Sequence, residues 1–287
     1  MTERPGAPAG DPAAHYDRIA DAWSLLLGDD FHYGDFAGGA ASLADATRAL
    51  TLRMVEAARI EPGVRVLDVG CGTGQAACLL AESHGCRVTG IATSGTVVEQ
   101  ARARAAQRGV ADRARFEVRD GMANGEPDAS YDRVWVLESS HLMPRKERLL
   151  AECARVLVPG GRLALCDLVL AREVPMAEVL KLAKELHTLR LAFGRAKMET
   201  LATYRRLAEA AGLAVTEVVD LREATEPTFA HWRRNLDRHR DRVATLIGDE
   251  GVAHFAASCD ILARFWREGV LGYGLVAARK PGAGEGR

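Results

Sequence analysis

The chain has 287 residues, of which 48% are hydrophobic and 27% are charged, and its formal net charge is −1. This length can bury one substantial α/β core with an accessory lid, and the near-zero charge gives no basic excess of the kind that nucleic-acid-binding proteins need. No apolar run approaches the length of a membrane span, and the six cysteines show no C-x-x-C spacing. These features predict a cytoplasmic protein without a disulfide framework or a metal site.

The N-terminal part is predicted to form a helical cap over residues 13–62. One helix is expected over residues 11–27 and another over residues 46–58, because apolar residues recur on one face of each. Residues 1–12 and 281–287 are rich in glycine, proline and alanine, so both ends of the chain are predicted to be disordered.

From residue 63 onward, predicted strands and helices alternate, which is typical of a right-handed parallel α/β sheet. The core is predicted over 63–170, a helical lid insert over 171–198, and the C-terminal part of the core over 199–280, with a helical insert at 227–268. Strands are expected at residues 64–69, 86–91, 115–118, 132–137, 162–168, 213–220 and 270–279. Helices are expected at residues 74–84, 94–108, 145–157, 174–190 and 199–211, and as two helices joined near Gly248–Gly251.

The stretch V-L-D-V-G-C-G-T-G at residues 66–74 joins the first strand of the core to its first helix. Gly70 and Gly72 allow the backbone to turn with positive φ and let a ligand approach main-chain N–H groups. Gln75 stands where a dinucleotide-binding fingerprint has its third glycine. Asp68, just before the turn, would repel a pyrophosphate but attract an ammonium. The predicted ligand is therefore a nucleoside with a cationic tail, which S-adenosylmethionine provides.

This run resembles closely the first motif of class I S-adenosylmethionine-dependent methyltransferases. The resemblance implies a Rossmann-like α/β fold, in which a seven-stranded, mostly parallel sheet carries helices on both faces and a helical lid. It also implies that the sixth and seventh strands pair antiparallel at the edge of the sheet. A glycine-rich turn that binds no ligand is the simpler alternative.

The second strand ends in G-I-A-T-S at residues 90–94, without the acidic residue that many nucleoside-binding α/β proteins place there for the ribose hydroxyls. Thr93, Ser94 and Gln100 offer neutral hydrogen-bonding groups instead. The run is similar to the form found in cyclopropane-fatty-acid synthases and natural-product methyltransferases. We therefore expect these three residues to bind the ribose, although Thr93 or Ser94 can also cap the helix that follows.

Asp120, Gly121 and Met122 follow the third strand. Asp120 can accept a hydrogen bond from the adenine amino group while the next two backbone units meet the edge of the ring, at the strand end where α/β proteins bind ligands. The alternative is a turn aspartate before a glycine. Leu137 and Glu138, at the end of the fourth strand, face the same cleft and are also assigned to the cofactor.

The aromatic segment 31–35 is interpreted either as a loop packed on the core or as a cap over the cofactor, with the Tyr33 phenol offered to its methionine end. A small, fairly apolar acceptor is predicted to bind between this segment and the lid, against Phe31, Phe36, Leu180, Leu186, Leu189 and Phe193. No nucleic-acid or membrane partner is predicted, and the formation of homo-oligomers is left open. The basic residues of the segment 231–242 are diluted by acidic ones, which indicates a solvated helix face.

The fourth strand is followed by E-S-S-H-L-M-P at residues 138–144. This segment resembles the E-S-L-H-H-M-P motif of antibiotic-tailoring methyltransferases such as the rebeccamycin sugar O-methyltransferase. His141 matches the first histidine of that motif, and Leu142 stands at the second. The other catalytic residue of that family, the acid in A-D-F-V-L, matches Asp167 in C-D-L-V-L. The resemblance is strongest over residues 64–170.

The methyl group of a sulfonium is already activated, so its transfer mainly requires a nucleophile that has lost its proton and is held near the carbon. An imidazole takes up a proton near neutral pH, and a carboxylate beside it favours its charged form. His141 is therefore predicted to be the base, with Asp167 as its orienter or as a second base. The alternatives are a partly exposed loop histidine and an aspartate that caps a helix or lies in an edge strand.

The predicted function is the transfer of a methyl group from S-adenosylmethionine to a small-molecule acceptor in secondary metabolism, with O-methylation favoured. C- or N-methylation by the same frame is one alternative, and a cofactor-binding cyclase or scaffold without methyl transfer is another. An RNA methyltransferase would be expected to show a basic face or an N/D-P-P-Y-type motif, and the sequence has neither.

Overall fold

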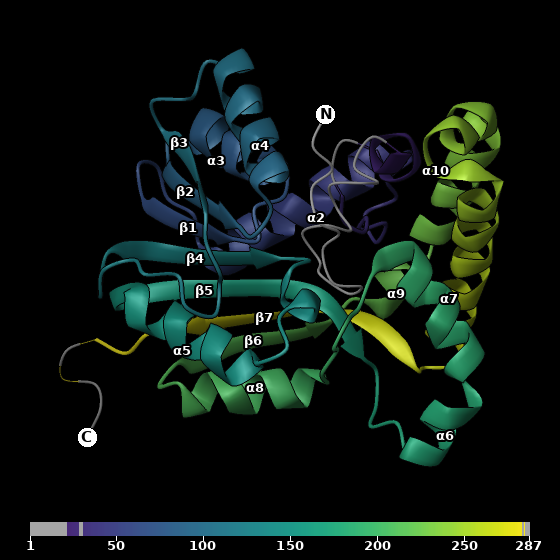
Figure 1. Ribbon diagram of the computed structural model, residues 1–287. Coiled ribbons are helices and arrows are strands. Elements are labelled where there is room, and N and C mark those ends of the chain that lie inside the picture. The colour runs from purple at the N-terminus through teal and green to yellow at the C-terminus, as the bar shows by residue number, and fades with distance from the viewer. Residues whose placement is uncertain (1–21, 29–30, 283, 285–287) are drawn as a thin grey trace, which may run out of the picture.

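A computed structural model describes residues 22–28, 31–282 and 284 of the chain. They contain a seven-stranded sheet with the strand order β3-β2-β1-β4-β5-β7-β6 (Figure 1). Its strands are β1 (Arg65–Val69), β2 (Arg87–Ala92), β3 (Ala114–Val118), β4 (Tyr131–Leu137), β5 (Leu157–Leu170), β6 (Ala214–Asp220) and β7 (Leu271–Arg279). The strands β1 to β5 pair in parallel, whereas β7 lies between β5 and β6 and runs antiparallel to both. The expected mostly parallel sheet with an antiparallel pair at its edge is confirmed.

The central strands form where the sequence has nearly continuous apolar runs. In β1, Val66, Leu67 and Val69 are all buried, because both faces of the sheet are covered. Parallel pairing places Asp68 of β1 opposite Trp135 of β4, and residues paired in this way project from the same face of a sheet. The carboxyl ends of β1, β2 and β4 lie side by side as a result.

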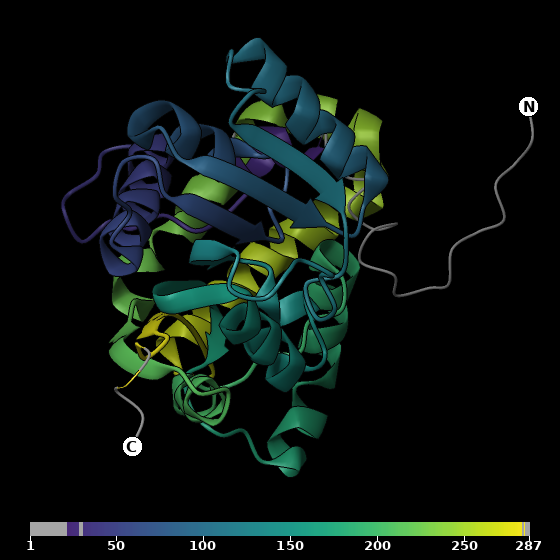
Figure 2. The ribbon, with the colours of Figure 1, turned by 90° about the vertical axis from the view of Figure 1, so that its left-hand side faces the viewer.

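Helices cover both faces of the sheet, as Figures 1 and 2 show. On one face, α5 (Lys146–Val156) and α8 (Leu201–Ala210) pack against the strands through a cluster that includes Leu149, Leu150 and Tyr204. The helices on the other face are α2 (Leu43–Ala58), α3 (Gln75–His84), α4 (Gly95–Gln107) and α10 (Thr228–Arg267). Two short elements, η1 (Ser140–Leu142) and α9 (Arg222–Thr225), complete the core.

The insert after β5 is mostly helical, in agreement with the helical stretch expected over 174–190. It forms α6 (Met176–Lys181) and α7 (Ala183–Phe193), with a break at Leu182. Neither helix contains a buried residue, and α7 lies alongside α10 (Figure 1). Gly248 interrupts α10 with a φ of 74° and a ψ of 167°, in agreement with the expectation of two helices joined near this glycine.

The N-terminal cap is described in part. Residues 22–27 are helical and bury Trp23 and Leu27, whereas the rest of the helix expected over 11–27 lies outside the described residues, as do residues 1–12 and most of the predicted C-terminal tail. The helix α2 begins earlier than expected because Ser42 caps it, accepting a hydrogen bond on Oγ from the Asp45 N–H at 3.1 Å.

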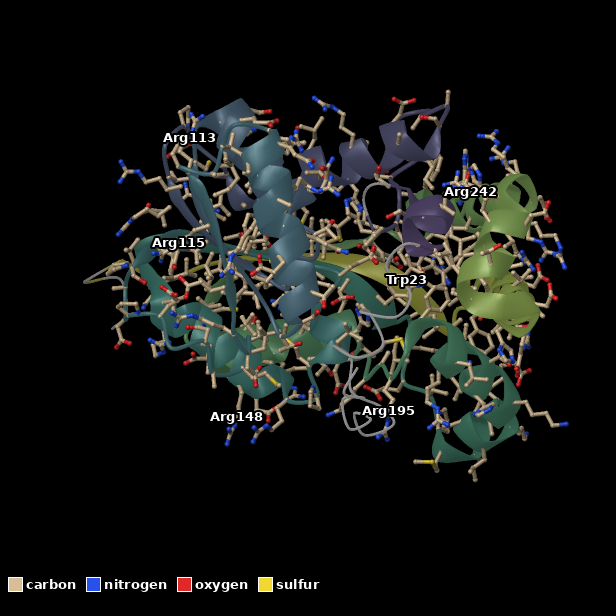
Figure 3. The ribbon with its side chains drawn as sticks, turned by 45° about the horizontal axis from the view of Figure 1, so that its top comes forward. Trp23, Arg113, Arg115, Arg148, Arg195 and Arg242 are labelled. Atoms are coloured by element: carbon tan, nitrogen blue, oxygen red, sulfur yellow. The ribbon has the colours of Figure 1, made fainter. Side chains whose placement is uncertain are left out.

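Basic side chains do not gather on one surface in the view of Figure 3. The arginines labelled there are exposed and spread around the edge of the molecule: Arg113, Arg115, Arg148, Arg195 and Arg242. Across the ranges that the structure describes, no helix combines the length and the apolar character needed to cross a membrane.

Candidate active site

A cavity of about 350 Å³ opens at the carboxyl ends of β1, β2 and β4 and at the loop after β3. Parallel strands place these ends at one edge of the sheet, which is where α/β proteins bind ligands. The cavity is lined by all of the predicted cofactor residues except Tyr33 and Gln100: Asp68, Gly70, Gly72, Gln75, Thr93, Ser94, Asp120, Gly121, Met122, Leu137 and Glu138. Its volume lies in the range of small-molecule sites.

The glycine turn between β1 and α3 is fixed to the neighbouring strand and open toward the cavity. The N–H groups of Gly70 and Cys71 donate to the Ile91 carbonyl of β2 at 2.8 and 3.1 Å. Gly70 has a φ of 81°, and a Cβ there would overlap the Ser139 side chain. Gly72 has a φ of 51°, and a Cβ there would meet no atom within 4 Å. The first glycine is therefore needed for packing, whereas the second leaves its backbone accessible to a ligand.

Asp68 lies in the cavity wall with one carboxylate oxygen that no described residue pairs. The residue is 2% exposed, and its Oδ2 has no hydrogen-bond partner among the described residues. Burial raises the pKa of this carboxyl from 3.8 to about 7. Because an unpaired buried carboxylate is costly, this atom indicates a ligand that brings a donor or a positive charge. The ammonium at the methionine end of S-adenosylmethionine fits that requirement.

Ser94 and Asp120 combine a local structural role with a place at the cavity. Ser94 caps α4, since its Oγ accepts a hydrogen bond from the Val97 N–H at 3.2 Å. Asp120 closes a turn, since its Oδ1 accepts from the Met122 N–H at 2.8 Å. The capping and turn alternatives are therefore both realised, and in both residues they coexist with a position in the cavity wall.

Gln100, which the sequence predicted to bind the ribose, does not line the cavity. Val97, in the first turn of α4, lines the cavity, whereas Gln100 is nearly one turn further along the helix and does not. Gln75 does line the cavity, but its Oε1 accepts hydrogen bonds from Nη1 of Arg104 and Nη1 of Arg108 at 2.6 and 3.0 Å. The amide oxygen of Gln75 thus links α3 to α4 and is engaged without any ligand.

The Tyr33 phenol, which the sequence offered to the methionine end of the cofactor, lies in the core and not in the cavity wall. The Tyr33 side chain is 2% exposed and does not line the cavity. It stacks on Trp266 with 5.3 Å between the ring centroids, and its ring lies 5.0 Å from that of Tyr273. The two preceding residues, Phe31 and His32, line the cavity instead. The segment 31–35 therefore packs on the core through Tyr33, as one of the two alternatives predicted, and borders the cavity through Phe31 and His32.

Glu138 joins the cavity to the N-terminal cap and to β7. Its Oε1 accepts hydrogen bonds from the Tyr33 N–H at 2.5 Å and from the Tyr273 hydroxyl at 2.7 Å. Burial raises the pKa of this carboxyl well above its usual value, and these two hydrogen bonds oppose the effect. The backbone of Glu138 has a φ of 46°, which is uncommon for a residue with a side chain and turns the chain sharply at the end of β4.

His141 and Asp167 form a close pair beside the cavity. His141 Nδ1 lies 2.6 Å from Asp167 Oδ1, and the Asp167 side chain is fully buried. Asp167 also accepts hydrogen bonds from the His141 N–H at 3.0 Å, the Ser140 hydroxyl at 2.5 Å and the Leu168 N–H at 2.7 Å. Burial alone would raise the pKa of Asp167, but attraction to His141 and these hydrogen bonds outweigh it and hold the pKa below its usual value.

The neighbours of this pair exclude an edge-strand position for Asp167 and show where His141 lies relative to the cavity. Asp167 lies in β5, between β4 and β7, so it is not in an edge strand. His141 itself is not part of the cavity wall, although Ser139 before it and Leu142 after it are. The His141 side chain is 12% exposed.

The cavity wall has members that the sequence reasoning missed, and the lid contributes less than expected. The missed residues include His32, Val97, Arg119, Trp135, Met143 and Pro144. Of the residues predicted to hold the acceptor, Phe31 alone lines the cavity within the described part of the chain. Leu180 of α6 is 69% exposed, and Phe193 of α7 packs on Trp23 with 6.0 Å between the ring centroids.

Comparisons with known proteins agree with this site. The family described as "Methyltransferase domain" matches residues 66–161. The chain is 36% identical to the 27-O-demethylrifamycin SV methyltransferase of Amycolatopsis mediterranei (strain S699), over 93% of this chain and 95% of that protein. It is 34% identical to the methyltransferase GfsG of Streptomyces halstedii, over 83% and 84% of the two chains. Among solved structures, the [4+2]-cyclase SpnF superposes with a TM-score of 0.81 at 28% identity, covering 97% of this chain and 100% of that one. The chain belongs to the S-adenosylmethionine-dependent methyltransferases.

Proposed function

We propose that this methyltransferase methylates a hydroxyl oxygen of a small, fairly apolar secondary metabolite, with His141 as the base that removes the hydroxyl proton. The observation that carries this proposal is the pairing of His141 with the buried Asp167 beside the cavity. S-adenosylmethionine supplies an activated methyl group when it is bound, so the protein has to supply position and a proton acceptor.

The tautomer of His141 follows from the ionisation of Asp167. An ionised carboxylate can only accept hydrogen bonds, so the hydrogen shared by the pair belongs to His141 Nδ1. The Nε2 atom of a neutral His141 then carries the lone pair, and it makes no hydrogen bond to any described residue. After Nε2 takes a proton, the negative charge of Asp167 stabilises the imidazolium.

The walls of the cavity support an apolar acceptor. Next to the histidine, Leu142, Met143 and Pro144 line it, and Phe31 of the cap and Trp135 of β4 contribute aromatic rings. Several relatives, among them the 27-O-demethylrifamycin SV methyltransferase, are named for transfer to oxygen. Their names favour oxygen over nitrogen or carbon as the accepting atom of this enzyme.

The opposite part of the cavity is proposed to hold the cofactor. Asp68 would bind the ammonium, and the exposed backbone at Gly72 would contact the methionine end. Thr93 and Ser94 would bind the ribose, and the backbone after Asp120 would meet the adenine. Gly70, Gln75, Leu137 and Glu138 would then shape the remaining wall.

The test is methyl transfer from labelled S-adenosylmethionine to candidate hydroxylated metabolites. His141→Ala is expected to leave cofactor affinity nearly intact and to lower kcat by roughly 10²–10⁴, the usual effect of losing a positioned base. His187→Ala, on the exposed surface of α7, is the matched control. A His141→Ala enzyme that methylates its acceptor at the wild-type rate would exclude this role of the histidine.

A second candidate is cyclisation without methyl transfer, which the likeness to the [4+2]-cyclase SpnF favours. The same labelled-methyl assay separates the two. A cyclase converts its substrate with no label incorporated and with no need for the methyl group, so the demethylated cofactor S-adenosylhomocysteine would sustain its rate. A methyltransferase is inhibited by that compound.

A further inference from the structure

A chain of hydrogen bonds continues behind the His141–Asp167 pair into another layer of the protein. The Ser140 hydroxyl donates to Asp167 Oδ2 at 2.5 Å, and the Tyr204 hydroxyl lies 2.7 Å from the Ser140 Oγ. Ser140 is fully buried and Tyr204 is 1% exposed. Tyr204 comes from α8, 64 positions along the sequence from Ser140, so this contact is a product of the tertiary fold.

The direction of each hydrogen in this chain can be derived. Ser140 has a single hydroxyl hydrogen, and the ionised Asp167 must receive it because a carboxylate has none to give. The Ser140 oxygen is then an acceptor toward Tyr204, so the phenol is the donor. Burial raises the pKa of Tyr204, with the charge of Asp167 adding to the effect, which keeps that phenol protonated.

With Ser140 in place, each oxygen of Asp167 accepts two hydrogen bonds. Oδ1 receives the His141 Nδ1–H and the Leu168 N–H, and Oδ2 receives the His141 N–H and the Ser140 hydroxyl. A carboxylate held by four donors cannot rotate without breaking some of them, and in a buried site each broken bond is costly.

We propose that Ser140 and Tyr204 are positioning residues, which hold the Asp167 carboxylate in the plane that keeps His141 in its Nδ1–H tautomer. This proposal rests on the proposed role of His141 as base. Neither Ser140 nor Tyr204 lines the cavity, so both hydroxyls would act on the reaction through Asp167.

The first test observes the tautomer without any acceptor, by ¹⁵N NMR of histidine-labelled protein with S-adenosylhomocysteine bound. In the wild type, neutral His141 is expected as the Nδ1–H form. In Ser140→Ala, and to a smaller extent in Tyr204→Phe, the Nε2–H form should appear in measurable amount. Tyr131→Phe is the matched control, because that buried tyrosine donates to Glu126 at 2.7 Å and lies at the opposite end of β4.

The second test measures kcat in two backgrounds. Ser140→Ala should lower kcat about 10- to 100-fold and Tyr204→Phe about fivefold, as expected for a hydrogen bond to a charged and to a neutral group respectively, with KM for the cofactor unchanged. In the His141→Ala background both substitutions should have no further effect, since they act through that histidine. Ser140→Thr, which keeps the hydroxyl, should restore most of the rate.

The outcomes separate this proposal from the proposed function. Wild-type tautomer and kcat in both variants would overturn the positioning role, and so would equal losses with and without His141. If His141→Ala were fully active but Ser140→Ala still changed the tautomer, the hydrogen-bond chain would stand and the base would be wrong.

Discussion

The two buried aspartates of the candidate site, Asp68 and Asp167, differ in their hydrogen-bond partners. Asp68, in the cofactor half, has an oxygen without a partner among the described residues, and burial raises its pKa to about 7. Asp167, in the catalytic half, is surrounded by donors that hold its pKa below the usual value despite complete burial. The catalytic half is therefore complete in the protein alone, whereas the cofactor half is complete only with its ligand.

Asp167→Asn is expected to have the largest effect on catalysis. The amide keeps the shape of the side chain but can present a hydrogen to His141, which favours the wrong tautomer, and losses of roughly 10³–10⁴ in kcat are typical of such a change. Single-turnover methyl transfer measures it. Asp132→Asn, at the start of β4, is a control in which kcat should stay near wild type. A decrease in kcat of less than tenfold in Asp167→Asn would contradict the idea that Asp167 holds His141 in its reactive tautomer.

Gly72→Val is expected to abolish cofactor binding in titration calorimetry. A branched side chain at a φ of 51° is strained and occupies the space above the turn. Gly212→Val is the control for backbone strain. Gly212 has a φ of 83° and open space around it but does not line the cavity, so its substitution should strain the backbone without excluding the ligand. Unchanged affinity in a folded Gly72→Val protein would remove the glycine turn from the cofactor site.

The affinity for S-adenosylmethionine is expected to rise roughly tenfold between pH 5.5 and 7, because the ammonium binds the ionised form of Asp68. This window lies below the pKa of about 8 of an α-amino group, so the ligand charge stays constant. Asp68→Asn should weaken binding and remove the pH dependence. 5′-Methylthioadenosine, which lacks the amino-acid end, should bind both proteins alike at every pH.

The raised pKa of Asp68 also predicts that the stability of the ligand-free protein falls with rising pH, whereas cofactor affinity rises. Its pKa is raised on folding from 3.8 to about 7, so the folded state binds more protons in that window and the free energy of unfolding falls as pH rises through it. Without ligand, Asp68→Asn should therefore raise Tm at pH 8, as measured by calorimetry. A lower Tm would mean that Asp68 has a partner within the protein.

Gln100→Leu is expected to have the smallest effect. The side chain does not line the cavity, and its Oε1 is buried without a partner among the described residues. Cofactor affinity should stay within about twofold of wild type, and Tm should not fall, because the change removes an unsatisfied polar atom. A clear loss of affinity would restore Gln100 to the ribose site.

The sequence was sufficient to predict the features that follow from regular periodicity. Parallel strands bring their carboxyl ends to one edge, so the order of strands and helices was enough to place Asp68, Thr93 and Asp120 together. The pairing of His141 with Asp167 came from a motif resemblance and is present in the structure.

The differences between the predicted and the observed cavity wall have specific physical causes. Val97 and Gln100 differ by three positions on one helix, and the sequence does not fix how far along a helix the ligand extends. His32 and Tyr33 are neighbours in a loop, which has no period to say which side chain faces inward. The sequence gives no sign that Tyr204 belongs near the site, because it approaches Ser140 only when α8 packs on the sheet.

The hydrogen bond from the Tyr33 N–H to Glu138 leaves the residues around the acceptor freer to change between related enzymes. This part of the cap is attached through a main-chain group, which every amino acid except proline provides. The side chain of Phe31, which borders the cavity, can therefore be exchanged without losing that attachment, whereas the buried His32 ring is itself bonded to the Tyr33 carbonyl and the Thr51 hydroxyl. Related enzymes could in this way acquire different acceptors by drift at the position of Phe31, while the strands, the glycine turn and the paired histidine stay unaltered.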